Sequence, residues 1–217
     1  MKILYLCPGR ARAEREGNLT AGSTPRDFFY GIETLRAAGN DVEIGDTRAA
    51  ATGPLAALHL RYEIARNSAF NFGTSLQRVR SLAGSLSDSD VAISFTDGFS
   101  LSLGRYGRTR APDTTLVAGF HGISTFVERA RHGSGAYMRA QTRRALENLD
   151  HIFFFGEADR EFAIDHYQLD ISRTSIFRFG IDLDFWTPDA GLDEDSRTTV
   201  LSVGSDPARD FPTLLAA

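Results

Sequence analysis

The stretch LDHIFFFGEADREFAIDHY, residues 149–167, decides the fold class of this chain. Ile152–Phe155 is a nearly all-apolar run of strand length, which is typical of a strand buried on both faces of a parallel sheet. Glu157–Tyr167, directly after it, has a helical pattern. A buried strand that leads into a helix is the repeating unit of α/β proteins.

The same alternation of short apolar runs and helical segments continues on both sides of this unit. The sequence predicts further strands at Ile3–Cys7, Val42–Gly45, Val91–Phe95, Thr115–Phe120 and Thr174–Phe177. It predicts helices from Pro25 to about Gly39, over most of Leu55–Leu86, at Phe99–Arg105 and at Tyr137–Leu149. Thr24 suits an N-cap and Pro25 a first helical position, so we expect one helix from there. The predicted fold class is α/β, a doubly wound parallel sheet of the Rossmann-like kind.

The composition fits a globular protein and argues against several classes. Hydrophobic residues make up 42% and charged residues 24% of the 217 residues, so a core can form. The formal net charge of −4 argues against a nucleic-acid-binding surface over the whole molecule. The single cysteine, Cys7, allows no internal disulfide, and no stretch approaches the roughly 18 apolar residues of a spanning helix. Because no signal peptide is recognisable, we expect a cytoplasmic protein.

The character of the chain changes near residue 188. Thr187–Thr199 is polar and acidic, which is typical of a linker. Beyond it, Val200–Gly204 is predicted to be a fresh strand and Phe211–Ala217 the start of a helix. We therefore expect a domain at residues 1–188, a linker at 189–198 and the opening of a second, truncated lobe at 199–217.

Four segments resemble the retaining GT-B glycosyltransferases that use nucleotide sugars, of the family 4-like kind. The most specific is IFRFGIDLDFWTP, residues 176–188. Its Gly-Ile-Asp turn, aromatic pair and proline resemble the residues that this family has where the chain crosses from one lobe to the other. Leu149–Glu157 resembles the family's aspartate, apolar strand and acidic helix start. Gly119–Gly122 resembles its strand-ending His-Gly, and Val200–Ala217 resembles the first strand, loop and helix of its donor-binding lobe.

The resemblance implies an N-terminal, acceptor-binding lobe of a GT-B fold and an activity. The intact protein would transfer a sugar from a nucleotide diphosphate sugar to a hydroxyl acceptor (a glycan, a lipid or a small molecule), with retention and without metal or cofactor. This chain would be inactive alone. The family commonly holds the donor diphosphate with an arginine and a lysine after the donor-lobe glycine. Here Ser205 and Asp206 follow Gly204, so Gly204 and Arg209 are the expected contacts.

A further diphosphate contact is expected at Gly22-Ser23. These residues precede the predicted helix, and glycine lets the backbone approach a phosphate group closely. An ordinary loop glycine beside an N-cap is the alternative. The connection Pro8–Thr24, which contains Arg10, is long for a strand-to-helix loop, where roughly 2–6 residues are usual. We interpret it as an acceptor-side lid, and a solvated insertion is the alternative.

Two polar residues follow predicted strands at the carboxyl edge of the sheet, where ligands bind in open α/β folds. His121, with Gly122 after it, follows Thr115–Phe120, and Asp97 follows Val91–Phe95. We predict that His121 binds the acceptor or the donor sugar and that Asp97 contacts an acceptor hydroxyl. Capping of the next helix is the alternative for Asp97.

The segment Phe126–Ala145 is locally basic, with arginines from Arg129 to Arg144. One interpretation is peripheral contact with anionic lipid head groups or an anionic acceptor, and the other is a solvated helix face. The histidines lack metal-like spacing to acidic or sulfur partners, so no metal site is predicted.

Two other functional classes stay open. A dehydrogenase or epimerase would need a Gly-rich turn after Ile3–Cys7, and Pro8-Gly9-Arg10-Ala11 lacks that pattern. A non-catalytic carbohydrate- or partner-binding module would keep the fold without the chemistry, and the altered Ser205-Asp206 position is compatible with it.

Overall fold

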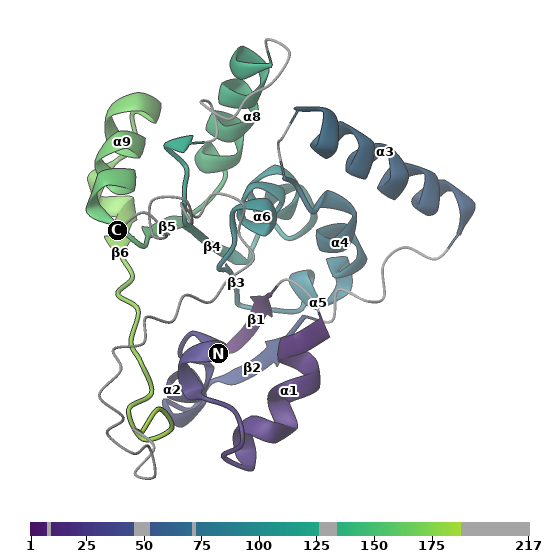
Figure 1. The fold of residues 1–217 in the computed structure, drawn as a ribbon. Helices are drawn as coiled ribbons and strands as arrows, with labels where there is room; N and C mark the ends of the chain where they lie inside the picture. Colours follow the sequence, from purple (N-terminus) through teal and green to yellow (C-terminus); the bar gives the residue numbers. More distant parts are fainter. Residues whose placement is uncertain (8–9, 46–52, 71–72, 126–133, 188–217) are drawn as a thin grey trace, which may run out of the picture. The chain divides into compact units, whose positions relative to one another are not determined.

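The structure is a computed structural model that describes residues 1–7, 10–45, 53–70, 73–125 and 134–187. Six parallel strands form one sheet in the order β2-β1-β3-β4-β5-β6 (Figure 1). The strands are β1 Lys2–Leu6, β2 Asp41–Ile44, β3 Val91–Ser94, β4 Thr115–Phe120, β5 His151–Phe154 and β6 Thr174–Ile176. Each coincides with a predicted strand, so the α/β, Rossmann-like class is confirmed.

Helices connect the strands. They are α1 Arg10–Thr20, α2 Ile32–Ala37, α3 Pro54–Phe70, α4 Leu76–Ser81, α5 Ala83–Ser87, α6 Asp97–Arg110, α8 Gly135–Glu147 and α9 Glu157–Tyr167, with 3-10 turns η1 Arg26–Phe29 and η3 Ile171–Arg173. The helical predictions for the middle of the chain are confirmed in outline, and α6 is longer than expected.

The expectation of one continuous helix from Pro25 is wrong. Pro25 precedes the short turn η1, and the chain then takes left-handed conformations at Tyr30, with φ of 51°, and at Gly31, with φ of 84°. Because consecutive left-handed residues cannot continue a right-handed helix, α2 begins only at Ile32. Thr24 does not cap the turn. The predicted stop at Gly39 is confirmed by its φ of 82°.

The prediction that Pro8–Thr24 is a loop is also wrong over its described part, whereas its interpretation as an acceptor-side lid stays a prediction. Residues 10–20 form α1, and the side chain of Leu19 is buried against the sheet cluster that contains Phe29. The helix has little apolar periodicity, since RARAEREGNLT carries one large apolar residue, so the pattern gave no helical signal.

Both faces of the sheet are covered, because successive side chains of a buried strand point to opposite faces. On β1, Leu4 and Leu6 join a large core cluster with residues of α4, α5, α6, α8 and α9. Ile3 and Tyr5 join a second cluster with α1, η1 and α2 on the other face. The fold is therefore wound on both faces, as predicted.

The strand order creates a switch point between β1 and β3. After β1 the chain passes to β2 on one side, whereas after β3 it passes to β4 on the other. In such sheets, ligands bind in the crevice outside the carboxyl ends of the two diverging strands. The topology therefore favours a ligand site at the carboxyl edge near β1 and β3.

The helix layer behind the sheet is closely packed where α6 crosses α8. A Cβ added to Gly104 would lie 2.3 Å from the carbonyl oxygen of Ala145. Only glycine permits this approach, which fixes α6, and with it Asp97 at its start, against the sheet.

Met1–Trp186 forms one compact unit. Residues 188–217 lie outside the described part of the chain, so the linker and the second lobe stay predictions. Among the described helices, none has the length and apolar character needed to cross a membrane.

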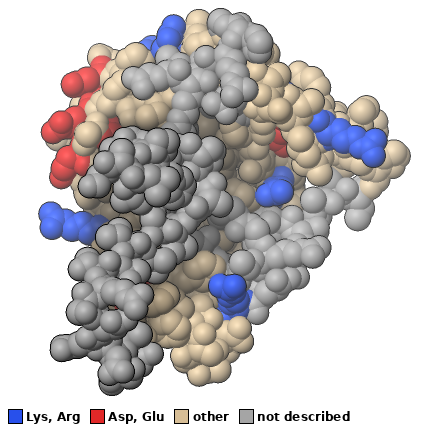
Figure 2. All heavy atoms as spheres, in the orientation of Figure 1, with Lys and Arg blue, Asp and Glu red and all other residues tan. Residues whose placement is uncertain are grey.

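Charged side chains are unevenly distributed over the face drawn in Figure 2. Acidic side chains gather on the side of α9, whose sequence is EADREFAIDHY, and the visible basic side chains lie apart from one another. The described residues of this face form no continuous basic surface of the kind that binds nucleic acid.

Candidate functional site

An aromatic cluster lies at the carboxyl edge of the sheet. Its central ring, Phe95, directly follows β3 and stacks on Tyr5 of β1 at 4.8 Å between centroids and on Tyr30 at 4.9 Å. Phe95 also contacts Phe153 of β5 at 5.0 Å and Phe177, which follows β6, at 5.6 Å. The rings therefore tie the ends of non-adjacent strands together across the switch point.

His121 extends this cluster towards solvent. It follows β4, as predicted, and its exposed ring stacks on Phe155 at 3.8 Å, while Phe155 stacks on Phe179 at 4.7 Å. The ring nitrogen Nε2 of His121 hydrogen-bonds to the backbone carbonyl oxygen of Phe95 at 2.8 Å. Phe179 is 54% exposed, so the outer end of the cluster offers a flat aromatic surface to a ligand.

Asp97 and His121 are brought together, as expected for two residues at the same edge. The backbone N–H of His121 donates to Oδ1 of Asp97 at 2.8 Å. Burial raises the pKa of the Asp97 carboxyl above its usual range, and hydrogen bonds from the backbone N–H groups of His121 and Gly122 partly offset that rise. Asp97 is the first residue of α6 and Thr96 is its N-cap, so the capping role proposed for Asp97 is not what is observed.

A return segment, defined here as Phe177–Trp186, leaves β6 and passes over η1 and α2. It is held there by Asp182, which accepts hydrogen bonds from Arg26: 2.8 Å from the backbone N, 3.1 Å from Nε and 2.7 Å from Nη2. Arg26 also pairs with Asp184. These hydrogen bonds from Arg26 hold the pKa of Asp182 well below its usual range.

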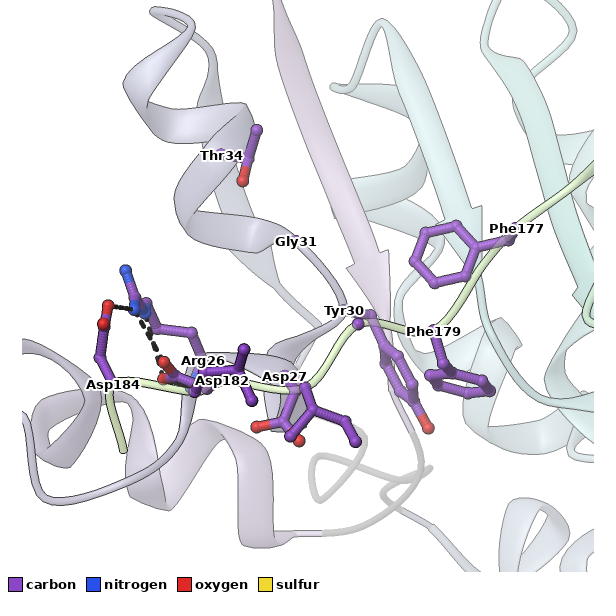
Figure 3. Close-up of a pocket in the computed structure, with 12 residues that line it drawn as sticks. Arg26, Asp27, Tyr30, Gly31, Thr34, Phe177, Phe179, Asp182 and Asp184 are labelled. Atoms are coloured by element: carbon purple, nitrogen blue, oxygen red, sulfur yellow. Dashed lines mark hydrogen bonds and ion pairs between the residues drawn. The ribbon is translucent and has the colours of Figure 1, made fainter. Parts of the chain in front are cut away.

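An open pocket of about 510 Å³ lies between the return segment and the η1–α2 region (Figure 3). Its walls come from the η1–α2 region on one side and from Phe177 and 179–184 on the other; the residues of the first side are Arg26, Asp27, Tyr30, Gly31 and Thr34. In Figure 3 the Arg26–Asp182 pair lies at one end, and Tyr30 and Phe179 lie at the other. The pocket is therefore charged at one end and aromatic at the other, where it meets the aromatic cluster.

Asp27 supplies an unsatisfied group in this pocket. Its Oδ1 atom is buried and has no hydrogen-bond partner among the described residues. An acceptor in that state costs free energy, on the order of 1–3 kcal/mol, unless a ligand or water donates to it. A hydrogen-bond donor of a molecule in the pocket could satisfy this oxygen once a small rotation of the Asp27 side chain turns it towards the pocket.

Gly22 and Ser23 follow the end of α1, and their backbone N–H groups are used there rather than at the start of η1. Their backbone N–H groups donate to the carbonyl oxygens of Leu19 at 3.0 Å and Asn18 at 2.9 Å, and Gly22 has a φ of 69°. This is the hydrogen-bond pattern of a glycine C-cap. Their contact with a diphosphate stays a prediction, and it would require these donors to leave α1.

The remaining predicted site residues divide into two groups. Gly122 lies beside His121, and its carbonyl oxygen accepts from the hydroxyl of Thr125 at 3.0 Å. The side chain of Arg10 and all of Gly204 and Arg209 lie outside the described part of the chain. Of the predicted basic segment, Arg139, Arg143 and Arg144 are exposed on α8, whereas residues 126–133 are not described.

The sequence alone did not reveal Arg26 and Asp27 as site residues, and Asp182 was noted only as part of the Gly-Ile-Asp turn. Arg26 and Asp182 are separated by 156 positions, so no local pattern pairs them. The described residues contain no group of three or more side chains placed to hold a metal ion.

Comparison with known proteins does not identify a family for this chain. No protein-family model matches the chain, and no curated protein is significantly similar to it.

Proposed function

We propose that this chain is the acceptor-binding lobe of a GT-B-type glycosyltransferase that uses a nucleotide diphosphate sugar. The observation that carries the proposal is the pocket at the carboxyl edge, where the unpartnered Oδ1 of Asp27 lies between a charge-paired arginine and an aromatic surface. A sugar-like acceptor has hydroxyl donors on its edge and apolar C–H groups on its face, so it suits both ends of this pocket.

The polar end would hold the acceptor hydroxyls. Asp27 offers a buried oxygen that needs a donor, whereas the carboxylates of Asp182 and Asp184 are already engaged by Arg26. A hydroxyl that donates to Asp27 would therefore be oriented by one acceptor of fixed position. Asp27 is assigned the role of binding and orienting the acceptor.

The aromatic end would hold the apolar face of the same ligand. Tyr30 and Phe179 are 5.5 Å apart between centroids, and Phe179 also lies 6.0 Å from the ring of His121. Aromatic faces carry partial negative charge and attract polarised C–H groups. The His121 prediction thus becomes part of this proposal, with His121 as a neighbour of the acceptor's apolar face.

In the proposed reaction, the bond between the anomeric carbon and the donor's diphosphate oxygen breaks, and a bond to the acceptor oxygen forms. The resemblance implies that the departing diphosphate takes the acceptor's proton. The residues described here would position the acceptor, since holding a nucleophile in a reactive orientation lowers the entropic part of the barrier.

Ligand-observed NMR of the purified chain with a panel of methyl glycosides and polyols tests the binding step. We expect at least one class to bind, and Asp27→Ala to weaken that binding roughly tenfold or more because a charge-assisted hydrogen bond is lost. Asp27→Asn keeps an acceptor oxygen and should lose less. Asp113→Ala, an exposed aspartate outside the pocket, is the matched control. Unchanged binding by Asp27→Ala, or no binding by the wild type, would contradict the proposal.

A carbohydrate-binding module without catalysis is the second candidate, favoured by the exposure of Phe179. The two candidates differ in one measurement on the full-length gene product. Release of nucleoside diphosphate from a nucleotide sugar, dependent on the bound acceptor, supports the transferase. Acceptor binding without such release supports the module.

A further inference from the structure

A second, smaller pocket lies in the helix layer on the other face of the sheet, between α3, α6, α8 and the chain before α4. Its volume is about 80 Å³, and its polar lining consists of Arg66, Thr74, Ser102, Arg105, Tyr137 and Gln141. A cavity of this size has room for a few water molecules or one compact polyatomic ion. It shares no residue with the pocket at the carboxyl edge.

Two guanidinium groups in this pocket have unused donors. Nε of Arg66 and one Nη atom of Arg105 are buried, and neither has a hydrogen-bond partner among the described residues. The Arg66 side chain is only 19% exposed. Buried donors of a charged group are costly when they are left unpaired, because the group has lost water without gaining a partner.

The carboxylate in the neighbourhood does not neutralise the pair. Glu63 lies 3.9 Å from Nη2 of Arg66, but its oxygens accept from the hydroxyl of Thr74 at 2.7 Å and from the backbone N–H groups of Leu76 and Gln77 at 2.7 and 3.1 Å. Glu63 therefore serves mainly to anchor the start of α4. Among the described residues, Arg105 makes no ion pair.

The surroundings of Arg105 disfavour its positive charge. Burial lowers the pKa of Arg105, and repulsion from Arg144 and Arg66 lowers it further, with Tyr137 opposing the change. Three arginines thus share one region with a single engaged carboxylate. An anion in the pocket would pair with the unused donors and screen the repulsion.

We propose that this pocket binds a compact oxyanion of the phosphate type through Arg66 and Arg105. Guanidinium groups match the geometry of tetrahedral oxyanions, and two of them converging on one cavity are typical of phosphate recognition. Thr74, Ser102 and Gln141 add neutral polar groups to the lining. The anion is either free phosphate or the phosphate group of a larger molecule whose remainder lies outside the cavity.

Thermal unfolding of the purified chain in phosphate, compared with chloride at the same ionic strength, tests the proposal, with 31P NMR titration for affinity. We expect phosphate to raise the unfolding temperature of the wild type. Arg105→Gln and Arg66→Gln should weaken phosphate binding roughly tenfold to a hundredfold, as befits the loss of charged hydrogen bonds. Arg110→Gln is the matched control, because Arg110 is an exposed arginine of the same helix outside the pocket, and it should bind phosphate as the wild type does.

A second readout separates a ligand site from a structural one. In chloride alone, Arg105→Gln should unfold at the same temperature as the wild type or a higher one, because the change removes an unpaired, repelled charge. Methyl phosphate distinguishes the two sources: equal or tighter binding than inorganic phosphate identifies a phosphorylated ligand, and weaker binding identifies the free ion. The proposal is overturned if phosphate and chloride have the same effect on the wild type, or if Arg105→Gln keeps its phosphate response.

Discussion

The two ends of the carboxyl-edge site are held by different forces. At one end, the aromatic cluster around Phe95 is packed into the sheet, and its inner rings are buried. At the other end, the return segment is held by the Arg26–Asp182 pair, in which Arg26 is 55% exposed. Packing of apolar rings depends little on pH or salt, whereas an exposed ion pair depends on both. The aromatic end around Phe95 is therefore called the fixed wall below, and the return segment with its Arg26–Asp182 pair is called the closure. Changes in pH or salt are expected to loosen the closure and to leave the fixed wall in place.

The largest effect is expected from overpacking the fixed wall. A Cβ added at Gly119 would lie 2.2 Å from Cε2 of Phe153, whose ring is enclosed by Phe95 and Phe177. We expect Gly119→Ala to lower the free energy of unfolding by about 1–3 kcal/mol, measured by urea titration. Gly84→Ala is the control, since no atom lies within 4 Å of its added Cβ and helix propensity favours alanine there. Equal effects of the two changes would show that the wall is not tightly packed.

A smaller effect, confined to the closure, is expected from Asp182→Asn. The change leaves Arg26 with Asp184 as its remaining carboxylate partner in the described structure, so the return segment should open more often. Hydrogen exchange should become faster for the amides of residues 177–186 while those of β4 stay protected. High salt should also make hydrogen exchange faster for residues 177–186 of the wild type, because salt screens the Arg26–Asp182 pair. Asp184→Asn, at a side chain that is 87% exposed, should have a lesser effect. Unchanged exchange in Asp182→Asn would mean that packing, not charge, holds the segment.

The pH dependence of Asp182 follows from its lowered pKa. A carboxyl whose pKa is lower in the folded than in the unfolded protein contributes stability above its unfolded value, near 3.8, and loses that contribution as pH falls towards the folded pKa. The stability gap between wild type and Asp182→Asn should therefore be constant at neutral pH and begin to narrow as pH falls below the unfolded value of 3.8. Urea titrations from neutral pH down to about pH 3 measure this onset. A gap that does not narrow at all by pH 3 would contradict the assignment.

The smallest effect, with the opposite sign, is expected at Asp97. Its pKa is raised by burial, so its contribution to stability is greatest below the unfolded value of 3.8 and is lost as pH rises through the folded pKa. Asp97→Asn keeps an oxygen for the N–H of His121 and removes the buried charge. The variant should equal or exceed the wild type in stability at neutral pH, and any difference should vanish in acid. Lower stability of Asp97→Asn at neutral pH would instead mean that the charge itself is needed.

The sequence predicted the sheet and the location of the edge residues well. Thr115–Phe120 and Glu157–Tyr167 have the bounds that were expected, because their apolar periods are uninterrupted. His121 and Asp97 were placed together by topology alone, since parallel strands end at one edge.

The parts that could not be predicted depend on distant pairing or on backbone conformation. A non-glycine residue such as Tyr30 rarely adopts a left-handed conformation, so the sequence does not indicate the break between η1 and α2. The ion pair of the return segment joins Arg26 to Asp182, and the second, smaller pocket is lined by both Arg66 of α3 and Arg105 of α6. Charged residues far apart in sequence have no local signal that says which of them will meet.

The contact between His121 and the Phe95 carbonyl determines which chemical groups the ring can recognise. A carbonyl oxygen only accepts, so Nε2 carries the proton, and Nδ1 of the neutral imidazole is left with a lone pair. The backbone directly after β3 thereby selects one tautomer of the neutral ring. A partner that approaches Nδ1 of the neutral ring in its plane must offer a hydroxyl or amide hydrogen, and a ketone or carboxylate would meet repulsion there.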